Sequence, residues 1–230
     1  MRSPKSILKP SYAVARKLFP NATKQLRCCY RLAVDYGQYR SIKRGLPVLV
    51  DGSPIPWFTY PAIEYLEQID LSDKNVFEWG SGNSTRYWAA RCRSATAIEN
   101  QPSWFDSVAS DLAANARVWL RESPDGYVNA ISSMEKAFDI IVIDGIERER
   151  CAAVAADFLS ESGFIILDNS DWHPLAAKSL RTKSLIQVDF AGFGPVNEYA
   201  WTTSFFLRRH FDFHPRMSDW PRPAIGGLAR

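Results

Sequence analysis

The stretch VFEWGSGNST, residues 76–85, joins a short apolar run to a glycine-rich turn and then to a hydroxyl-rich segment. A strand, a glycine turn and a helix in this order are typical of an open α/β sheet, whose ligands bind beyond the carboxyl ends of the strands. Gly80 and Gly82 would let a ligand approach the backbone closely, and Ser84 would cap the following helix. A tight turn that needs glycine for its own geometry explains the same residues, so the rest of the chain must decide.

Short apolar runs alternate with helical stretches along most of the chain. The run DIIVID (139–144) has a continuous apolar centre, which indicates a strand covered on both faces. The loop AGFGPVNEYA (191–200) is too short for a crossover helix, so the strands that it joins should be antiparallel. Together these patterns predict an α/β fold: a doubly wound, mostly parallel, seven-stranded sheet with an antiparallel C-terminal strand. The predicted strands are residues 76–79, 95–99, 117–120, 139–143, 164–167, 185–190 and 202–208, and helices are predicted near 62–71, 84–93, 102–114 and 147–160.

Two acidic residues narrow the kind of ligand that this sheet would bind. Glu78 ends the first strand, where a carboxylate would repel the pyrophosphate of a dinucleotide, and Thr85 stands where a dinucleotide-binding loop has its third glycine. Glu99 ends the second strand, 21 positions after Glu78, an offset at which an acid can accept hydrogen bonds from ribose hydroxyls. These residues therefore favour a nucleoside that carries positive charge, such as an ammonium and a sulfonium group.

The pattern acid-x-Gly-x-Gly-x-Ser, with the spaced acid and the terminal hairpin, resembles the class I S-adenosylmethionine-dependent methyltransferases. The resemblance covers about residues 53–209 and implies that the glycines pass under the methionine part of the cofactor. Glu122 and Trp104 are further candidates beside the adenosine, although helix packing explains Trp104 equally well. The residues assigned to the cofactor are Glu78, Gly80, Gly82, Ser84, Glu99, Asn100, Ser123 and Asp144.

Polar residues also follow the fourth and fifth strands: Asp144 follows one, and the pair Asp168-Asn169 follows the other. Adjacent strands lie about 4.8 Å apart, so these oxygen donors are expected at one edge of the sheet, where they would suit Mg²⁺. The arrangement is similar to that of metal-dependent O-methyltransferases of the catechol and caffeoyl-CoA type. Methyltransferases without a metal also carry the first Asp, and the following DNS sequence suits a helix cap or a turn. Without a metal, Asp144 or His173 would act as general base.

Two aromatic segments are candidates for recognition of the methyl acceptor. PIPWFTYP (54–61) precedes the first strand, and GFGPVNEYAWTTS (192–204) connects the last two strands at the same edge of the sheet. Aromatic and polar side chains together suit a sugar or a phenolic ring. About half of these aromatic residues would serve the core equally well.

The positive charges are concentrated at the N-terminus. Residues 1–47 contain eleven Lys and Arg against one acid, a net charge of +10, whereas residues 48–230 carry a net charge of −7. The segment is predicted to be a basic arm that contacts anionic lipid or another polyanion, with a solvated extension as the alternative. We divide the chain into this arm (1–47), a methyltransferase-like domain (48–215) and a C-terminal tail (216–230).

The remaining composition favours a cytoplasmic protein that is at most peripheral to a membrane, with nucleic acid an improbable partner. No apolar run reaches the roughly 18 residues of a membrane-spanning helix, and the first residues lack the apolar centre of a secretory signal. The four cysteines (Cys28, Cys29, Cys92 and Cys151) form neither a disulfide framework nor a metal-binding motif, so reduced thiols are expected.

Three functions are consistent with these residues. The leading hypothesis is an S-adenosylmethionine-dependent methyltransferase that acts on oxygen of a small molecule or glycan, with Mg²⁺ as a further cofactor. The second is a non-catalytic module that keeps the fold and docks on a membrane or another polyanion through its arm. The third is a nicotinamide-dependent oxidoreductase, against which Glu78 and Thr85 argue.

Overall fold

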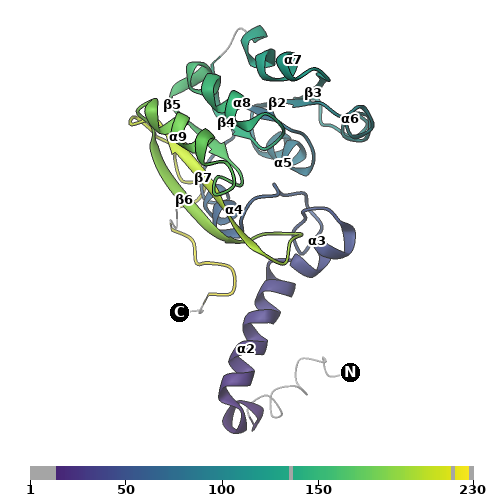
Figure 1. The fold of residues 1–230 in the computed structure, drawn as a ribbon. Coiled ribbons are helices and arrows are strands. Elements are labelled where there is room, and N and C mark those ends of the chain that lie inside the picture. The colour runs from purple at the N-terminus through teal and green to yellow at the C-terminus, as the bar shows by residue number, and fades with distance from the viewer. Residues whose placement is uncertain (1–13, 135–136, 219–220, 228–230) are drawn as a thin grey trace.

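The seven predicted strands form one sheet in a computed structural model that describes residues 14–134, 137–218 and 221–227. The strand order is β3-β2-β1-β4-β5-β7-β6; the first five strands are mutually parallel, and β7 runs antiparallel to both of its neighbours (Figure 1). The predicted doubly wound sheet with an antiparallel C-terminal strand is thereby confirmed. The strands are β1 (Asn75–Trp79), β2 (Ser94–Glu99), β3 (Ala116–Leu120), β4 (Phe138–Ile143), β5 (Leu159–Leu167), β6 (Ile186–Phe193) and β7 (Ala200–Leu207).

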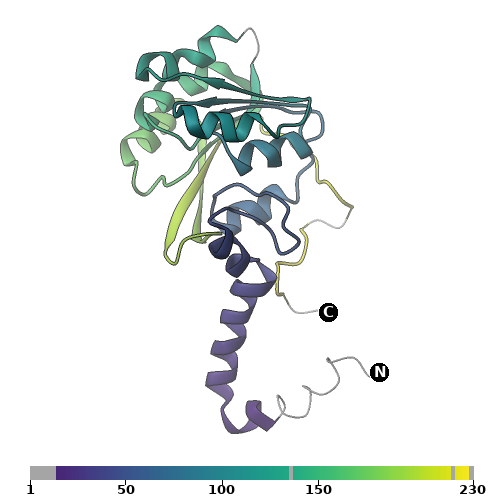
Figure 2. The same cartoon turned by 90° about the vertical axis from the view of Figure 1, so that its right-hand side faces the viewer.

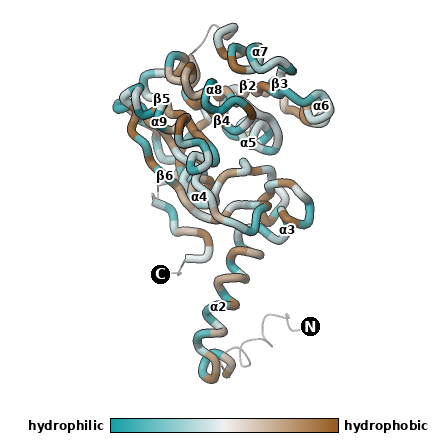
Figure 3. Tube along the Cα trace, in the orientation of Figure 1, coloured by the Kyte–Doolittle hydropathy of each residue, from teal (hydrophilic) through white to brown (hydrophobic). Residues whose placement is uncertain are grey.

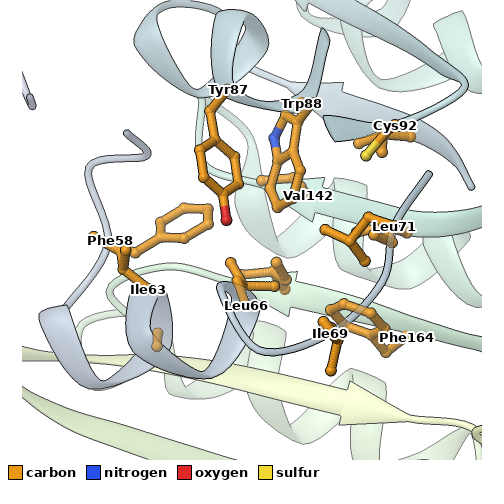
Figure 4. Packing of buried hydrophobic residues seen from close by; sticks show 14 of the residues in the cluster. Phe58, Ile63, Leu66, Ile69, Leu71, Tyr87, Trp88, Cys92, Val142 and Phe164 are labelled. Atoms are coloured by element: carbon orange, nitrogen blue, oxygen red, sulfur yellow. The ribbon is translucent and has the colours of Figure 1, made fainter. Parts of the chain in front are cut away.

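Residues that alternate along the central strands bury opposite faces of the sheet. Val76 and Ile140 belong to a cluster that α4 and α5 cover, whereas Phe77 and Ile141 belong to a second cluster under α7, α8 and α9. Figure 4 shows the first cluster, into which Trp88 of α5 points. The helices around the sheet are α4 (Tyr60–Leu66), α5 (Asn83–Arg91), α6 (Pro102–Ala109), α7 (Pro124–Val128), α8 (Arg148–Ala155) and α9 (Pro174–Thr182).

Several helix boundaries differ from the predicted ones. α4 ends at Leu66 rather than near residue 71, and Ile69 and Leu71 are buried from a loop instead. A loop that packs on the core can bury apolar residues at the same spacing as a helix does. The apolar pattern in the sequence therefore continues past the end of the helix. α6 ends before residue 114, α8 gives way to a short 3₁₀ turn and then to β5, and the sequence predictions do not include α7 or α9.

The N-terminal segment has a projecting part and a packed part. α2 (Pro20–Tyr30) extends away from the sheet in both views (Figures 1 and 2), and a π-helix (Arg31–Asp35) connects it to α3 (Gln38–Arg44). α3 is held on the body because the buried Gln38 side chain donates to the carbonyl oxygens of Gly194 (3.0 Å) and Asn197 (3.1 Å). The first thirteen residues of the predicted arm lie outside the described residues, and its boundary at residue 47 stays a prediction.

The four cysteines divide into an exposed pair and two buried residues. Cys28 and Cys29 are exposed on α2, and Cys92 and Cys151 are buried; all four are free thiols. Burial raises the pKa of the Cys92 and Cys151 thiols to about 12, so neither is a ready nucleophile.

Among the helices of the described ranges, none is both long and apolar enough to cross a membrane.

Candidate functional site

The site lies where the order of the strands changes direction. β1 is paired with β2 on one side and with β4 on the other. β2 and β3 extend the sheet toward one edge, and β4 and β5 extend it toward the other, so the strand order reverses at β1. Ligands of open α/β sheets bind outside the carboxyl ends of the strands at such a point. Gly80 follows β1 there with a φ of +104°, and a Cβ on it would meet the backbone of Asp144, after β4, at 3.3 Å. Both the turn geometry and the close approach of the two strand ends therefore require this glycine.

A cavity of about 320 Å³ opens beside the glycine loop. Its walls come from that loop, the ends of β4 and β5, the β6–β7 connection and the segment between α3 and α4, and its volume suits a small ligand. The lining residues are Leu46, Pro47, Trp57, Ser81, Gly82, Asn83, Ser84, Trp104, Asp144, Arg148, Asp168, Asn169, Trp172, Asn197, Tyr199 and Trp201.

Glu78 lies behind the glycine loop rather than in the cavity wall. Its side chain is 2% exposed, and its two carboxylate oxygens accept hydrogen bonds from Thr85 Oγ1 (2.7 Å) and Trp88 Nε1 (3.3 Å) of α5. Burial raises the pKa of Glu78 to about 7, against the hydrogen bonds from Ser84, Thr85 and Trp88, which lower it. The carboxylate thus acts on a ligand through its charge and through the loop that it holds.

Thr85 explains why the loop departs from the three-glycine pattern. Its hydroxyl donates to Glu78 and accepts from the Gly82 N–H (3.0 Å), so one side chain joins the acid, the loop and the first turn of α5. The prediction that Ser84 caps the helix is wrong, because α5 begins one residue earlier and its N-cap is Gly82. Ser84 lies in the first turn, lines the cavity and bonds to Glu78.

Glu99 meets the glycine loop from the end of β2. Its Oε2 accepts a hydrogen bond from Ser81 Oγ (2.7 Å), while Oε1 accepts from the backbone N–H groups of Asn100 and Gln101 (2.9 Å each). Trp104 Nε1 donates to the Ser81 carbonyl oxygen (2.8 Å), and the Trp104 side chain is 38% exposed. The structure therefore places Trp104 over the loop at the edge of the cavity, where helix packing does not account for it.

Six predicted site residues do not line the cavity: Glu78, Gly80, Glu99, Asn100, Ser123 and His173. Asn100 contacts Glu99 through its backbone, and Ser123 Oγ accepts from the Gly126 N–H (3.1 Å) as the N-cap of α7. His173 Nδ1 pairs with Glu149 Oε1 (2.9 Å) on the surface. The roles of Asn100 and Ser123 in cofactor binding and of His173 as general base stay predictions.

Arg148, which the sequence predictions do not include, joins the ends of β4 and β5. It stands at the start of α8, and its guanidinium donates to Asp144 Oδ1 (3.1 Å) and to Asn169 Oδ1 (2.8 Å). It also donates to the carbonyl oxygens of Asp168 (2.5 Å) and Gly145 (2.9 Å). The three residues predicted to hold Mg²⁺ are therefore brought together, but around a guanidinium group.

This group of residues does not fit a hard divalent cation. The oxygens of Asp144 and Asn169 that would bind the ion already accept hydrogen bonds from Arg148, and a fixed positive charge beside a second cation is unfavourable. Within residues 14–134, 137–218 and 221–227, no cluster of three or more His, Cys, Asp or Glu could hold a metal. The positive charge between the two strand ends is thus supplied by the protein itself.

Asp168 is the most deeply buried acid of the cavity wall. Its side chain is 2% exposed, and its Oδ1 accepts hydrogen bonds from Trp201 Nε1 (3.0 Å) and Thr203 Oγ1 (2.5 Å) of β7. Burial and the neighbouring Asp144 carboxylate raise the pKa of Asp168 above its ordinary range, although the Thr203 and Trp201 hydrogen bonds lower it. Burial likewise raises the pKa of Asp144 to about 6, and the Arg148 guanidinium opposes this shift.

The two aromatic segments predicted to recognise a substrate meet at the cavity. Thr59, in the segment that precedes α4, donates its backbone N–H to Thr203 Oγ1 on β7 (3.0 Å), which joins the two segments. Trp57 from the first segment and Tyr199 and Trp201 from the second line the cavity. Trp172 adds a further ring, with its centroid 5.9 Å from that of Tyr199. The cavity is therefore lined by aromatic rings together with carboxylate, guanidinium and amide groups.

The strand order with an antiparallel β7 is the topology of class I methyltransferases, and the cavity lies at the switch point of that fold. Among solved structures, the chain is similar to precorrin-6y C5,15-methyltransferase from Geobacter metallireducens GS-15, with a TM-score of 0.53, 14% identity, and coverage of 64% of this chain and 87% of that chain. It is also similar to the N-methyltransferase NodS from Bradyrhizobium japonicum WM9, with a TM-score of 0.50, 14% identity, and coverage of 64% and 93%. At these identities the likeness shows a shared fold. No protein-family model and no curated protein sequence matches the chain.

Proposed function

We propose that this chain is an S-adenosylmethionine-dependent methyltransferase that methylates oxygen of a small molecule or glycan without a metal ion. The observation that carries the proposal is the cavity at the β1/β4 switch point of a methyltransferase fold, with the glycine loop on one side and two carboxylates on the other. The cation that lines the cavity, Arg148, is engaged by Asp144 and Asn169, and Glu78 lies directly behind the glycine loop, so a cationic ligand is favoured over a dinucleotide.

The residues present fit S-adenosylmethionine. The backbone of the Gly80–Gly82 turn faces the cavity, where a Cβ on Gly82 would come within 3.6 Å of the Trp104 ring. Glu99 and Ser81 form a hydrogen-bonded pair beside the loop, as residues that hold ribose hydroxyls would. When bound, the cofactor supplies a methyl group on a positively charged sulfur; the charges of Glu78 and Asp144 would stabilise that cation.

For methyl transfer, the acceptor oxygen must lie in line behind the methyl group and must lose its proton. Asp144 and Asp168 line the cavity and provide carboxylates for that proton, while Arg148 fixes Asp144 through a hydrogen bond of 3.1 Å. The rings of Trp57, Tyr199 and Trp201 would pack on a sugar or phenolic face of the acceptor. A metal has no step in this scheme.

Thermal shift measurements test cofactor binding. S-adenosylmethionine and S-adenosylhomocysteine should each stabilise the protein, by about 2.7 kcal/mol at a hundredfold excess over Kd, whereas NAD should not. Stabilisation by NAD alone would contradict the proposal. Mass spectrometry of any ligand that co-purifies with the protein gives an independent identification.

Turnover tests the remaining parts of the proposal. Release of S-adenosylhomocysteine in the presence of an effective sugar or phenol acceptor should be insensitive to EDTA, and Asp168→Asn should lower kcat by roughly a hundredfold or more. Asp125→Asn is the matched control, because Asp125 pairs with Arg150 on the surface and lies outside the cavity. Cofactor binding without turnover on any acceptor would favour a non-catalytic binding module, and an EDTA-sensitive rate would contradict the metal-free scheme.

A further inference from the structure

α2 carries a row of exposed apolar side chains along one side. Phe19 at its N-cap, Leu26 and Tyr30 are 64%, 68% and 56% exposed. They are seven and four residues apart, so they lie on the same side of the helix. Figure 3 shows hydrophobic positions along this projecting helix, interrupted by hydrophilic ones. Leu18, at the end of the helical stretch 14–18 that precedes α2, is 66% exposed as well. We refer to Phe19, Leu26 and Tyr30 as the apolar row.

The described part of the chain leaves this apolar row exposed. Figures 1 and 2 show α2 extending away from the sheet and the helices that cover it. Thr23 is its buried residue, and the Thr23 hydroxyl bonds to the helix's own first carbonyl oxygens, Phe19 O and Pro20 O (3.0 Å each). Exposed aromatic and leucine side chains that cluster on one face mark an interaction surface.

The charge around the apolar row has one sign. Residues 1–34 contain eight Lys and Arg and no Asp or Glu, and the first acid of the chain, Asp35, is paired with Arg31. Lys24 and Arg27 of α2 are exposed and flank the apolar row on one side, because they follow Phe19 by five and eight residues. A helix that has aromatic and leucine residues in one row, Lys and Arg flanking that row, and no acids is complementary to an anionic, amphipathic surface.

We propose that α2, together with Arg16 and Lys17 before it, lies on an anionic lipid bilayer, with the apolar row in the interface and the cations at the headgroups. A second copy of the chain fits less well, because pairing the apolar rows of two arms would bring unbalanced positive charges together. Nucleic acid would bind the cations and leave the apolar row exposed to water. This inference rests on the arm alone, so it stands or falls independently of methyl transfer.

The arm is joined directly to a wall of the cavity. After α2 and the π-helix, the chain forms α3 and then Leu46 and Pro47, which line the cavity. Gln38 of α3 holds the β6–β7 connection through the carbonyl oxygens of Gly194 and Asn197. A docked arm therefore connects the bilayer surface to the side of the cavity that the aromatic segments form.

Vesicle co-sedimentation of the full-length protein tests the proposal with a matched pair of variants. Leu26→Glu and Gln25→Glu add the same charge to neighbouring exposed positions of α2, but only the first lies in the apolar row. On phosphatidylcholine vesicles that contain about 30% phosphatidylglycerol, the wild type should bind, Leu26→Glu should bind at least about tenfold more weakly, and Gln25→Glu less than about threefold more weakly. Vesicles of phosphatidylcholine alone should bind the wild type at least about tenfold more weakly.

Three results would overturn the proposal. Equal losses in the two variants would show an electrostatic contact that does not use the apolar row. A concentration-dependent dimer in analytical ultracentrifugation that Leu26→Glu abolishes would assign the apolar row to a second copy. Tighter binding to a duplex oligonucleotide than to anionic vesicles at the same salt concentration would assign the arm to nucleic acid. Both substituted positions are exposed, so equal melting temperatures are expected, and Phe19→Ser repeats the test at a second position of the row.

Discussion

Glu78 couples protonation to folding, because its carboxyl group is almost completely buried. Burial raises its pKa from 4.5 to about 7, so between these pH values the folded chain holds a proton that the unfolded chain releases. The free energy of unfolding should therefore fall, by at most ~3 kcal/mol from this group, as the pH rises from about 4.5 to 7. Urea unfolding at pH 5 and pH 8 measures the change.

Glu78→Gln isolates this contribution from those of the other buried acids. The amide cannot titrate, so the unfolding free energy of the variant should lack the part of the pH dependence that Glu78 contributes. The altered hydrogen bond to Trp88 changes that free energy by the same amount at every pH. Asp144 and Asp168 remain in both proteins and cancel in the difference. An identical pH dependence in the two proteins would show that Glu78 is charged in the folded state at pH 5.

Replacing the Arg148 side chain should destabilise the protein. Its side chain is 13% exposed, and Arg148→Met would leave the oxygens of Asp144, Asn169 and Asp168 without their donor. Breaking a largely buried ion pair in this way should cost ~3 kcal/mol or more of unfolding free energy. Arg150→Met is the control, because Arg150 is 46% exposed and its ion pairs lie in solvent. Similar urea midpoints for the two variants would contradict this account of the site.

The sequence contains a signal for Arg148 that is easily missed. Asp144 and Arg148 are four residues apart, a spacing that favours an ion pair, but IERERC also has the appearance of an ordinary charged helix surface. Thr85 is similar: it departs from a glycine pattern, and only the fold shows that its hydroxyl meets both Glu78 and Gly82. Residue types at strand ends predict which groups converge, whereas the hydrogen bonds among them depend on side-chain geometry.

At the scale of elements, the first turn of α5 depends on one hydroxyl. Thr85→Val keeps the shape of the side chain but leaves the Gly82 N–H and a Glu78 oxygen without this partner. Because both groups are buried, the variant should lose ~1–3 kcal/mol of unfolding free energy and bind S-adenosylhomocysteine more weakly. Thr85→Ser retains the hydroxyl and should lose much less. If Val and Ser have the same effect, packing of the methyl group rather than the hydrogen bonds holds the loop.

The elements differ in how far the sequence predicts them. The strands are predictable because continuous apolar runs end at polar or glycine residues, and all seven form, although β5 begins at Leu159, five residues before its predicted start. α9 begins at Pro174, and its mixed sequence, PLAAKSLRT, has a buried face that is mostly alanine, so its periodic signal is weak. α7 is too short for any periodic signal. Helix ends such as that of α4 are hidden because the following loop buries its own apolar residues.

At the scale of the whole molecule, the strand order decides where a ligand can bind. Seven strands with a short final connection predict the antiparallel β7, and the alternation of strands with helices predicts the parallel part. The switch point between β1 and β4 then brings the glycine loop and Asp144 together, as the sequence predicts from two separate strand ends. The aromatic wall also depends on the packing of α3 and the β6–β7 connection, which residue patterns along the strands do not encode.

The boundary between arm and body gives the last prediction. α2 projects from the body, whereas Gln38 and Ser41 of α3 are buried, and Ser41 Oγ donates to the Val48 carbonyl oxygen (2.8 Å). A chain that begins at residue 31 should therefore unfold cooperatively at the same melting temperature as the full chain, within about 2 °C. A chain that begins at residue 45 loses the hydrogen bonds of both side chains and should be less stable by at least ~2 kcal/mol. Because Gln38 also holds the cavity edge, this second truncation should weaken S-adenosylhomocysteine binding. If both truncations keep full stability, the arm extends to residue 47 as the charge distribution predicts; if the first is already destabilised, α2 contributes to the folded body.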